Sequence, residues 1–173
     1  MAVIIPESGM QFGEYKEEHV FQLEKSDQYT KELRPNGIKS CEFILRRNNK
    51  LYFIEAKKSC PKQIMEDTPE EKITKYKKYI QDIALKMKHS LSLYTNILLE
   101  RYEAKGVPEL LQEKNMSNID IRLVLVVKNA DKEWLIPFQD VFRKVLKDEL
   151  KIWKIPDFII INEITAREKH FVI

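Results

Sequence analysis

Two acidic residues and a lysine lie on neighbouring stretches of chain that could form one β-hairpin. Glu42 stands in the first stretch, and the triplet Glu55-Ala56-Lys57 ends the second. Mg²⁺ is typically held in proteins by one or two carboxylates together with water and substrate phosphates. A lysine beside such a cation can orient or deprotonate a metal-associated water, or neutralise charge on a phosphoryl transition state. These residue types therefore favour metal-dependent chemistry on a phosphate ester.

The turn between the two stretches fixes which residues face each other. Asn48-Asn49 separates two runs rich in Phe, Ile, Leu and Tyr, and Asn tolerates the positive φ of a type I′ turn. With a two-residue turn, Arg47 pairs with Lys50, and the pairing continues outward until Glu42 lies opposite Glu55. Like charges directly opposite each other destabilise a sheet, and a divalent cation between them would remove that conflict.

Alternation along the strands assigns the hairpin side chains to two faces. We expect Glu42, Glu55 and Lys57 to share one face, at the end of an otherwise apolar surface made by Ile44, Arg46, Leu51 and Phe53. The opposite face is predicted to carry Cys41, Phe43, Leu45, Tyr52, Ile54 and Ala56. Both faces are largely apolar, which is typical of central strands covered on both sides.

The chain after the hairpin alternates between helix and strand. Thr68-Pro69-Glu70-Glu71 has the form of a capping box, so we predict a helix over residues 69–105 that Gly106 and Pro108 end. Apolar residues recur along it every three or four positions: Ile73, Tyr76, Ile80, Ile83, Met87, Leu91, Tyr94 and Leu98. A buried strand is predicted over 119–128, a helix from Pro137, and a second apolar strand over 158–161.

The N-terminal third is less clearly patterned. Residues 1–14 read as a loop or a short edge strand, and residues 15–33 contain either a short strand at 19–23 or a helix after Ser26. A turn is predicted at 34–37. No internal repeat or linker divides the chain. We therefore expect one α/β domain over residues 1–173, with a mixed central β-sheet flanked by helices.

The hairpin and the elements after it resemble the PD-(D/E)XK nucleases, the restriction-endonuclease-like superfamily. In that family an acidic residue on one strand is followed by E-x-K on the next, then by a long helix and a further strand. The resemblance covers roughly residues 38–128, and it matches Glu42, Glu55 and Lys57 to the two acidic residues and the lysine. It implies hydrolysis of phosphodiesters with Mg²⁺ or Mn²⁺ held at Glu42 and Glu55.

The same resemblance implies a further acidic residue and a substrate. The first helix of the family often adds a glutamate to the metal site, and among Glu17, Glu18 and Glu24 we prefer Glu24. We expect a nuclease of restriction, repair or mobile-element type that acts on DNA more readily than on RNA. At this size, a nuclease that cuts both strands would need to act as a homodimer.

A non-catalytic interpretation stays open beside the nuclease hypothesis. The three residues could be an exposed cross-strand charge cluster that contributes about 0.2–1 kcal/mol or less. The fold would then serve as a binding module with a protein partner, because folds outlast their sites. The lysines of the long helix could follow a phosphate backbone, but we favour a solvated face for them: Lys72, Lys75, Lys77, Lys78, Lys86 and Lys88.

Composition narrows the remaining possibilities. The net charge of +3 and pI of about 8.7 permit nucleic-acid binding without arguing for it. Two cysteines, Cys41 and Cys60, make neither a disulfide framework nor a zinc cluster, and we expect Cys41 to be a core thiol. No stretch approaches the roughly 20 apolar residues of a membrane span, so we expect a cytoplasmic protein. Motifs of NTPases, dinucleotide-binding proteins, serine hydrolases and zinc proteases are absent from the sequence.

Overall fold

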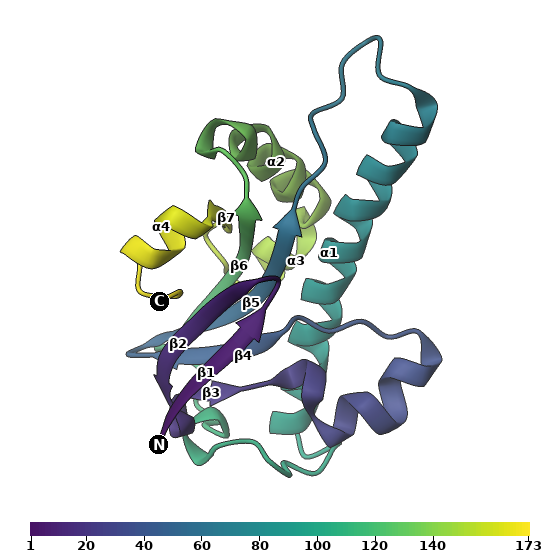
Figure 1. Cartoon of the computed structure of the whole chain (residues 1–173). Helices are drawn as coiled ribbons and strands as arrows, with labels where there is room; N and C mark the ends of the chain where they lie inside the picture. The colour runs from purple at the N-terminus through teal and green to yellow at the C-terminus, as the bar shows by residue number, and fades with distance from the viewer.

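A five-stranded β-sheet forms the centre of the computed structural model, which describes all 173 residues (Figure 1). The strand order is β3-β4-β5-β6-β7, with antiparallel pairing from β3 to β5 and parallel pairing from β5 to β7. The predicted mixed sheet flanked by helices is therefore confirmed. Its strands are β3 (Val20–Phe21), β4 (Phe43–Arg47), β5 (Lys50–Ser59), β6 (Asp120–Asn129) and β7 (Phe158–Asn162).

The β4–β5 hairpin has the predicted register over its paired residues, but the ladder stops before the predicted pair of Glu42 with Glu55, and the Glu42 N–H bonds to the carbonyl oxygen of Ile54 instead. Arg47 pairs with Lys50, and the ladder continues to Phe43 opposite Ile54. Asn48 has a φ of 54°, in the left-handed region that Asn tolerates better than most residues. The strand β5 lies between β4 and β6, in the middle of the sheet, which agrees with its apolar character on both faces.

Three helices cover one face of the sheet: α1 (Glu70–Leu98), α2 (Lys132–Val145) and α3 (Lys147–Ile152). The long helix α1 buries Ile80, Ile83, Met87 and Leu91 in the larger core cluster, as its periodicity predicts. Ile73 is only half-buried, because the first turns of α1 and the loop before them extend beyond the sheet (Figure 1).

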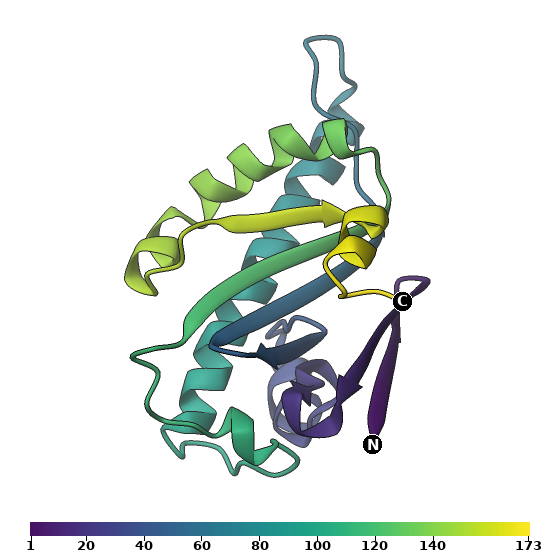
Figure 2. The same cartoon turned by 90° about the vertical axis from the view of Figure 1, so that its left-hand side faces the viewer.

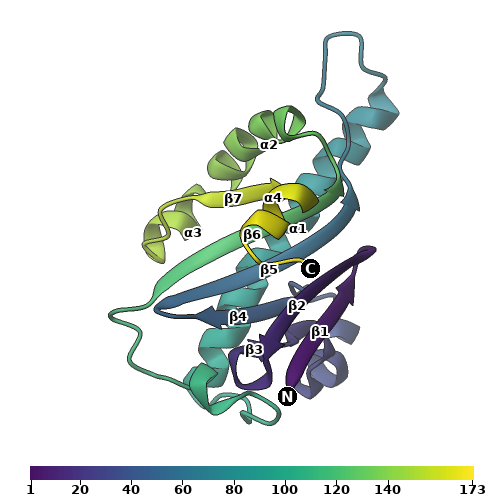
Figure 3. The ribbon, with the colours of Figure 1, turned by 60° about the vertical axis from the view of Figure 1, so that its left-hand side comes forward.

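The opposite face is covered by a separate hairpin and a short helix. The hairpin pairs β1 (Ala2–Glu7) with β2 (Met10–Lys16), and the helix is α4 (Glu163–Glu168). Figures 2 and 3 show α4 in front of the sheet, with α1 behind it. The ring of Phe12 in β2 packs edge-on against Phe43 of β4, with centroids 5.4 Å apart. The prediction of a loop or short edge strand at 1–14 was thus incomplete, since these residues form a covering hairpin.

Residues 15–33 contain parts of both predicted alternatives, a short strand and a helical segment. The strand β3 lies within the predicted stretch 19–23, and a short π-helical segment, η3 (Gln28–Leu33), follows Ser26. The predicted turn is the short helix η4 (Arg34–Asn36), which ends at Gly37 with a φ of 76°. The other short helices are η1 (Glu17–His19), η2 (Leu23–Lys25) and η5 (Glu109–Leu111).

The start of the long helix lies one residue from the predicted one, but its predicted cap and its predicted end were wrong. Thr68 does not cap α1, because its Oγ1 accepts a hydrogen bond from the Met65 N–H at 2.7 Å. The helix ends at Leu98, seven residues before the predicted end, and Glu100 takes a φ of 61°. The apolar stripe also stops at Leu98, so nothing anchors a longer helix to the sheet.

The start of α2 was also predicted wrongly. The helix begins at Lys132, and Pro137 lies inside it. Proline there removes one backbone donor. The apolar contacts of Leu135 and Phe138 hold the helix against the core on both sides of the proline.

No helix of the structure combines the length and the apolar character that a membrane crossing requires.

Replacing Ile83 with Ala should lower the free energy of unfolding by about 2–5 kcal/mol, because its fully buried side chain would leave a cavity beneath α1. Urea unfolding of both proteins measures the difference. Leu85→Ala on the same helix is the matched control, since Leu85 is exposed and its loss should cost much less. Equal losses in the two variants would show that the Ile83 face of α1 does not pack on the sheet.

Candidate functional site

Five charged side chains meet at the junction of the sheet, α1 and the N-terminal segment. They come from η2, from the residue before β4, from β5 and from α1. We call this group the carboxylate–lysine cluster: Glu24, Glu42, Glu55, Lys57 and Lys86. It contains every site residue predicted from the sequence and one further residue, Lys86.

Glu55 is the centre of the cluster. Its side chain is 0 % exposed, in the middle strand of the sheet. Its Oε1 lies 2.9 Å from the Nζ of Lys57 and 2.9 Å from the Nζ of Lys86, and its Oε2 lies 3.2 Å from the Lys86 nitrogen. Burial raises the pKa of Glu55, and the two ammonium groups oppose that shift by stabilising the charged form.

Glu42 is the second buried carboxyl group. Its Oε1 lies 3.7 Å from the Lys86 nitrogen, so one ammonium group reaches both carboxyl groups. Its side chain also forms a hydrogen bond with Glu24, which requires a proton between two groups that otherwise only accept. The buried Oε2 of Glu42 has no N–H or O–H donor from any other residue.

The pKa values indicate which carboxyl group holds the shared proton. Burial raises the pKa of Glu42 to about 9, and the hydrogen bond to Glu24 and the charge of Glu55 act in the same direction. Burial alone would raise the pKa of Glu24, but the hydrogen bond with Glu42 and the Lys86 ammonium lower it overall. The proton therefore belongs on Glu42.

Lys86 remains an ammonium although its side chain is only 13 % exposed. Burial by itself would lower the pKa of Lys86, but the carboxyl groups of Glu55 and Glu42 raise it above its ordinary value. The ammonium groups of Lys57 and Lys86 lie directly beside the buried carboxyl groups and compensate their charge. This balance is what allows so many charges to lie together beneath the surface.

Backbone contacts hold the cluster's elements in place. The Cys41 N–H donates to the Oγ of Ser90 on α1 at 2.8 Å, which ties the segment before β4 to the helix. The Glu42 N–H donates to the carbonyl oxygen of Ile54, and the Glu24 N–H donates to the carbonyl oxygen of Glu42. Four chain segments are therefore fixed around one point.

Cys41 lies on the face opposite to the predicted one. It is a buried core thiol, as expected, but it packs in the cluster on the α1 side together with Ile44 and Phe53. The regular strand β4 begins only at Phe43, so strict alternation of side chains does not extend back to Cys41. The side chain of Glu42 nevertheless points to the α1 side, because Lys86 of that helix reaches it.

The interpretation as an exposed charge cluster was wrong about exposure. Glu42 is 8 % and Glu55 0 % exposed, and an ion pair at that depth differs from a surface pair. Breaking a buried pair by removing one partner is costly, because the remaining charge is left without compensation.

Carboxylate oxygens such as those of Glu42 and Glu55 are the ligands that Mg²⁺ and Mn²⁺ prefer, and one or two of them with water are typical for Mg²⁺. The buried Oε2 of Glu42 is free of competing N–H donors, as a metal-binding oxygen would need to be. In the arrangement described here, no three or more acidic, histidine or cysteine side chains stand together as a ready metal site. The Lys86 nitrogen instead lies within 4 Å of oxygens of both Glu42 and Glu55.

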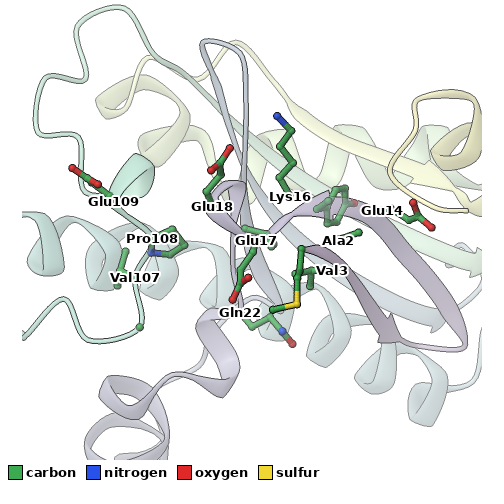
Figure 4. Close-up of a pocket in the computed structure, with 14 residues that line it drawn as sticks. Ala2, Val3, Glu14, Lys16, Glu17, Glu18, Gln22, Val107, Pro108 and Glu109 are labelled. Carbon is green, nitrogen blue, oxygen red and sulfur yellow. The ribbon is translucent and has the colours of Figure 1, made fainter.

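The other two N-terminal acidic candidates lie elsewhere. Glu17 and Glu18 line a broad hollow of about 1070 Å³ between the β1–β2 hairpin and residues 106–109 (Figure 4). Glu14 and Glu109 add further negative charge to its walls, so this hollow does not suit a phosphate-bearing substrate. Among the three candidates, only Glu24 contacts Glu42.

The sequence analysis missed the role of Lys86, which it grouped with the solvated lysines of the long helix. The sequence nevertheless indicates an inward position for Lys86, because it follows Tyr79 and Ile83 at helical spacing and precedes Ser90 by four residues. A lysine within such an inward-facing row needs a buried partner.

No protein-family model, curated protein or solved structure matches this chain.

Glu42→Gln should change how stability depends on pH in metal-free protein. Unfolded Glu42 loses its proton near its ordinary pKa, whereas the folded group keeps it until about pH 9, so wild-type stability falls as the pH rises through this window. A glutamine at position 42 does not titrate, so the variant lacks this loss of stability. As the pH rises from 6 to 9, the free energy of unfolding of Glu42→Gln relative to that of wild type should increase by on the order of 1–3 kcal/mol.

Urea unfolding in EDTA at several pH values measures this difference. The control is Glu133→Gln, which changes an exposed glutamate on α2 and should leave the pH dependence unchanged. Parallel pH curves for wild type and Glu42→Gln would contradict the buried, protonated state of Glu42.

Proposed function

We propose that this chain is a metal-dependent nuclease that hydrolyses phosphodiester bonds, with DNA as the expected substrate. The observation that carries the proposal is the convergence of Glu24, Glu42 and Glu55 with Lys57. These residues come from η2, from the residue before β4 and from β5, and the carboxyl groups would repel one another without cations. Costly burial of ionisable groups in one place is typical of functional sites.

The carboxyl groups of Glu42 and Glu55, supported by Glu24, would hold Mg²⁺ or Mn²⁺. A bound cation of this kind supplies Lewis-acid polarisation of a phosphoryl oxygen and lowers the pKa of an attached water. Lys57 is 27 % exposed and lies beside Glu55, so its ammonium can face both solvent and substrate. There it would orient the attacking water and neutralise charge that develops on the phosphate.

The order of elements supports the same proposal. A β-hairpin that is preceded by Glu42 and contains Glu55, a long helix, and a strand parallel to the second hairpin strand follow each other along residues 42–129. This order is the one expected of a restriction-endonuclease-like core, to which we assign the domain. Fold alone would not carry the function, because one fold serves many activities.

Positive charge near the cluster fits a polyanionic substrate. Arg34 acts electrostatically on Glu24 together with Lys86 and Lys57, and Lys39 acts on the neighbouring Tyr29. Arg34 is exposed, so its guanidinium could contact a phosphate.

The second candidate function is a non-catalytic binding module with a protein partner. One observation favours it: the carboxyl groups of Glu42 and Glu55 are already paired by the cluster's own lysines, as in a purely structural ion-pair group. The two functions differ in whether the cluster binds a divalent cation.

Lys57→Ala should abolish Mg²⁺-dependent cleavage and leave cation binding nearly intact, because Lys57 serves the water and the transition state. Glu55→Gln keeps the shape of the side chain but loses its charge, so it should lose both cleavage and cation binding. Lys58→Ala is the control, since the neighbouring Lys58 is exposed and outside the cluster. Cleavage of linear and supercoiled DNA, single strands and RNA is measured beside calorimetry with Mg²⁺ and Mn²⁺.

If the folded protein cuts none of these substrates and binds neither cation, the binding module replaces the nuclease as the proposed function. Small stability changes as the only effect of both substitutions would lead to the same conclusion.

A further inference from the structure

Lys86 occupies the position between the two buried carboxyl groups. Its nitrogen lies 2.9 and 3.2 Å from the two oxygens of Glu55 and 3.7 Å from Oε1 of Glu42. No other cation of the cluster contacts both residues, because Lys57 pairs with Glu55 alone. A cation that bridges Glu42 and Glu55 would need the same oxygens.

We propose that Lys86 is an internal competitor for the divalent cation, whose ammonium must leave Glu42 and Glu55 before the cation binds there. This inference rests on the proposed function and adds a residue that controls its metal site. An ammonium and a divalent cation cannot share these oxygens, because two positive centres a few ångströms apart repel each other strongly in a poorly hydrated site.

The helix can remain in place while the Lys86 side chain moves. Its neighbours Ile83, Met87 and Ser90 are buried, and they hold this part of α1 against the sheet without the lysine. The side chain is 13 % exposed, so it is not fully enclosed by the protein. The flexible stem of a lysine lets the head reach water while its methylene groups stay in contact with the protein.

Lys57 and Lys86 therefore contact the Glu55 carboxylate in different ways. Lys57 lies 2.9 Å from Oε1 of Glu55 and makes no ion pair with Glu42, whereas Lys86 of α1 donates to both oxygens of Glu55 and also pairs with Glu42. Lys57 can stay beside a bound cation, and Lys86 cannot. The apparent affinity for the cation is then the intrinsic affinity reduced by the fraction of molecules in which Lys86 has moved away.

Calorimetric titration of the full chain with Mn²⁺ tests this competition. Lys86→Met keeps an apolar stem without the charge, and we expect it to bind Mn²⁺ about tenfold more tightly than wild type, or better still. Lys86→Gln is a second neutral variant that can still donate to Glu55 if the methionine variant does not fold. Lys86→Arg keeps a positive charge and should show no such gain.

Lys88→Met is the matched control on the same helix. Lys88 pairs with Glu149 of α3 at 3.2 Å and does not reach the cluster, so its loss should leave the Mn²⁺ affinity unchanged. The thermal midpoint provides a second readout: Mn²⁺ should raise it more in Lys86→Met than in wild type.

The outcomes separate this inference from the proposed function. The competition is supported if the neutral Lys86 variants bind Mn²⁺ more tightly than wild type and Lys86→Arg and Lys88→Met do not. Equal or weaker binding in those variants, with clear binding in wild type, overturns the competition and leaves the metal site standing. Absence of Mn²⁺ binding in wild type and in every variant overturns both.

Discussion

The burial of the Glu55 carboxylate in the middle strand of the sheet is the constraint on which the rest of this structure depends. An isolated charge at that depth would be far more costly than the stability of an ordinary domain allows. The protein meets this constraint with two ammonium groups at 2.9 Å, one from β5 itself and one from α1. The position of α1 on the sheet is thus specified by charge as well as by the apolar contacts of Ile83 and Met87.

Local patterns were sufficient to predict the hairpin and most of the site. The Asn48-Asn49 turn determines register without reference to any other part of the chain, and register in turn brings Glu42 toward Glu55. The strands β6 and β7 and the inner face of α1 follow from apolar runs and from helical periodicity. These features depend on residues that are close together in sequence.

Features that depend on distant residues could not be predicted in the same way. Lys86 resembles its solvated neighbours until α1 is laid on the sheet and its nitrogen meets carboxyl groups 31 and 44 residues away in sequence. The β1–β2 hairpin is interrupted by Pro6 and Gly13 and is held on the sheet by contacts with residues distant in sequence, as between Phe12 and Phe43. Thr68 had the sequence of a cap but bonds to Met65, because a local competitor for its hydroxyl lies in the preceding loop.

The two faces of the sheet differ in a way that bears on how the chain finds its fold. The α1 face offers lysines to Glu42 and Glu55, whereas the side chains buried beneath the β1–β2 hairpin are almost entirely apolar. A slip of one residue between β4 and β5 would turn Glu42 toward that apolar side, away from Lys86. Such a misaligned hairpin would bury a carboxyl group without a counter-charge, at a cost of several kcal/mol. The buried charges therefore disfavour the misaligned hairpin relative to the observed one.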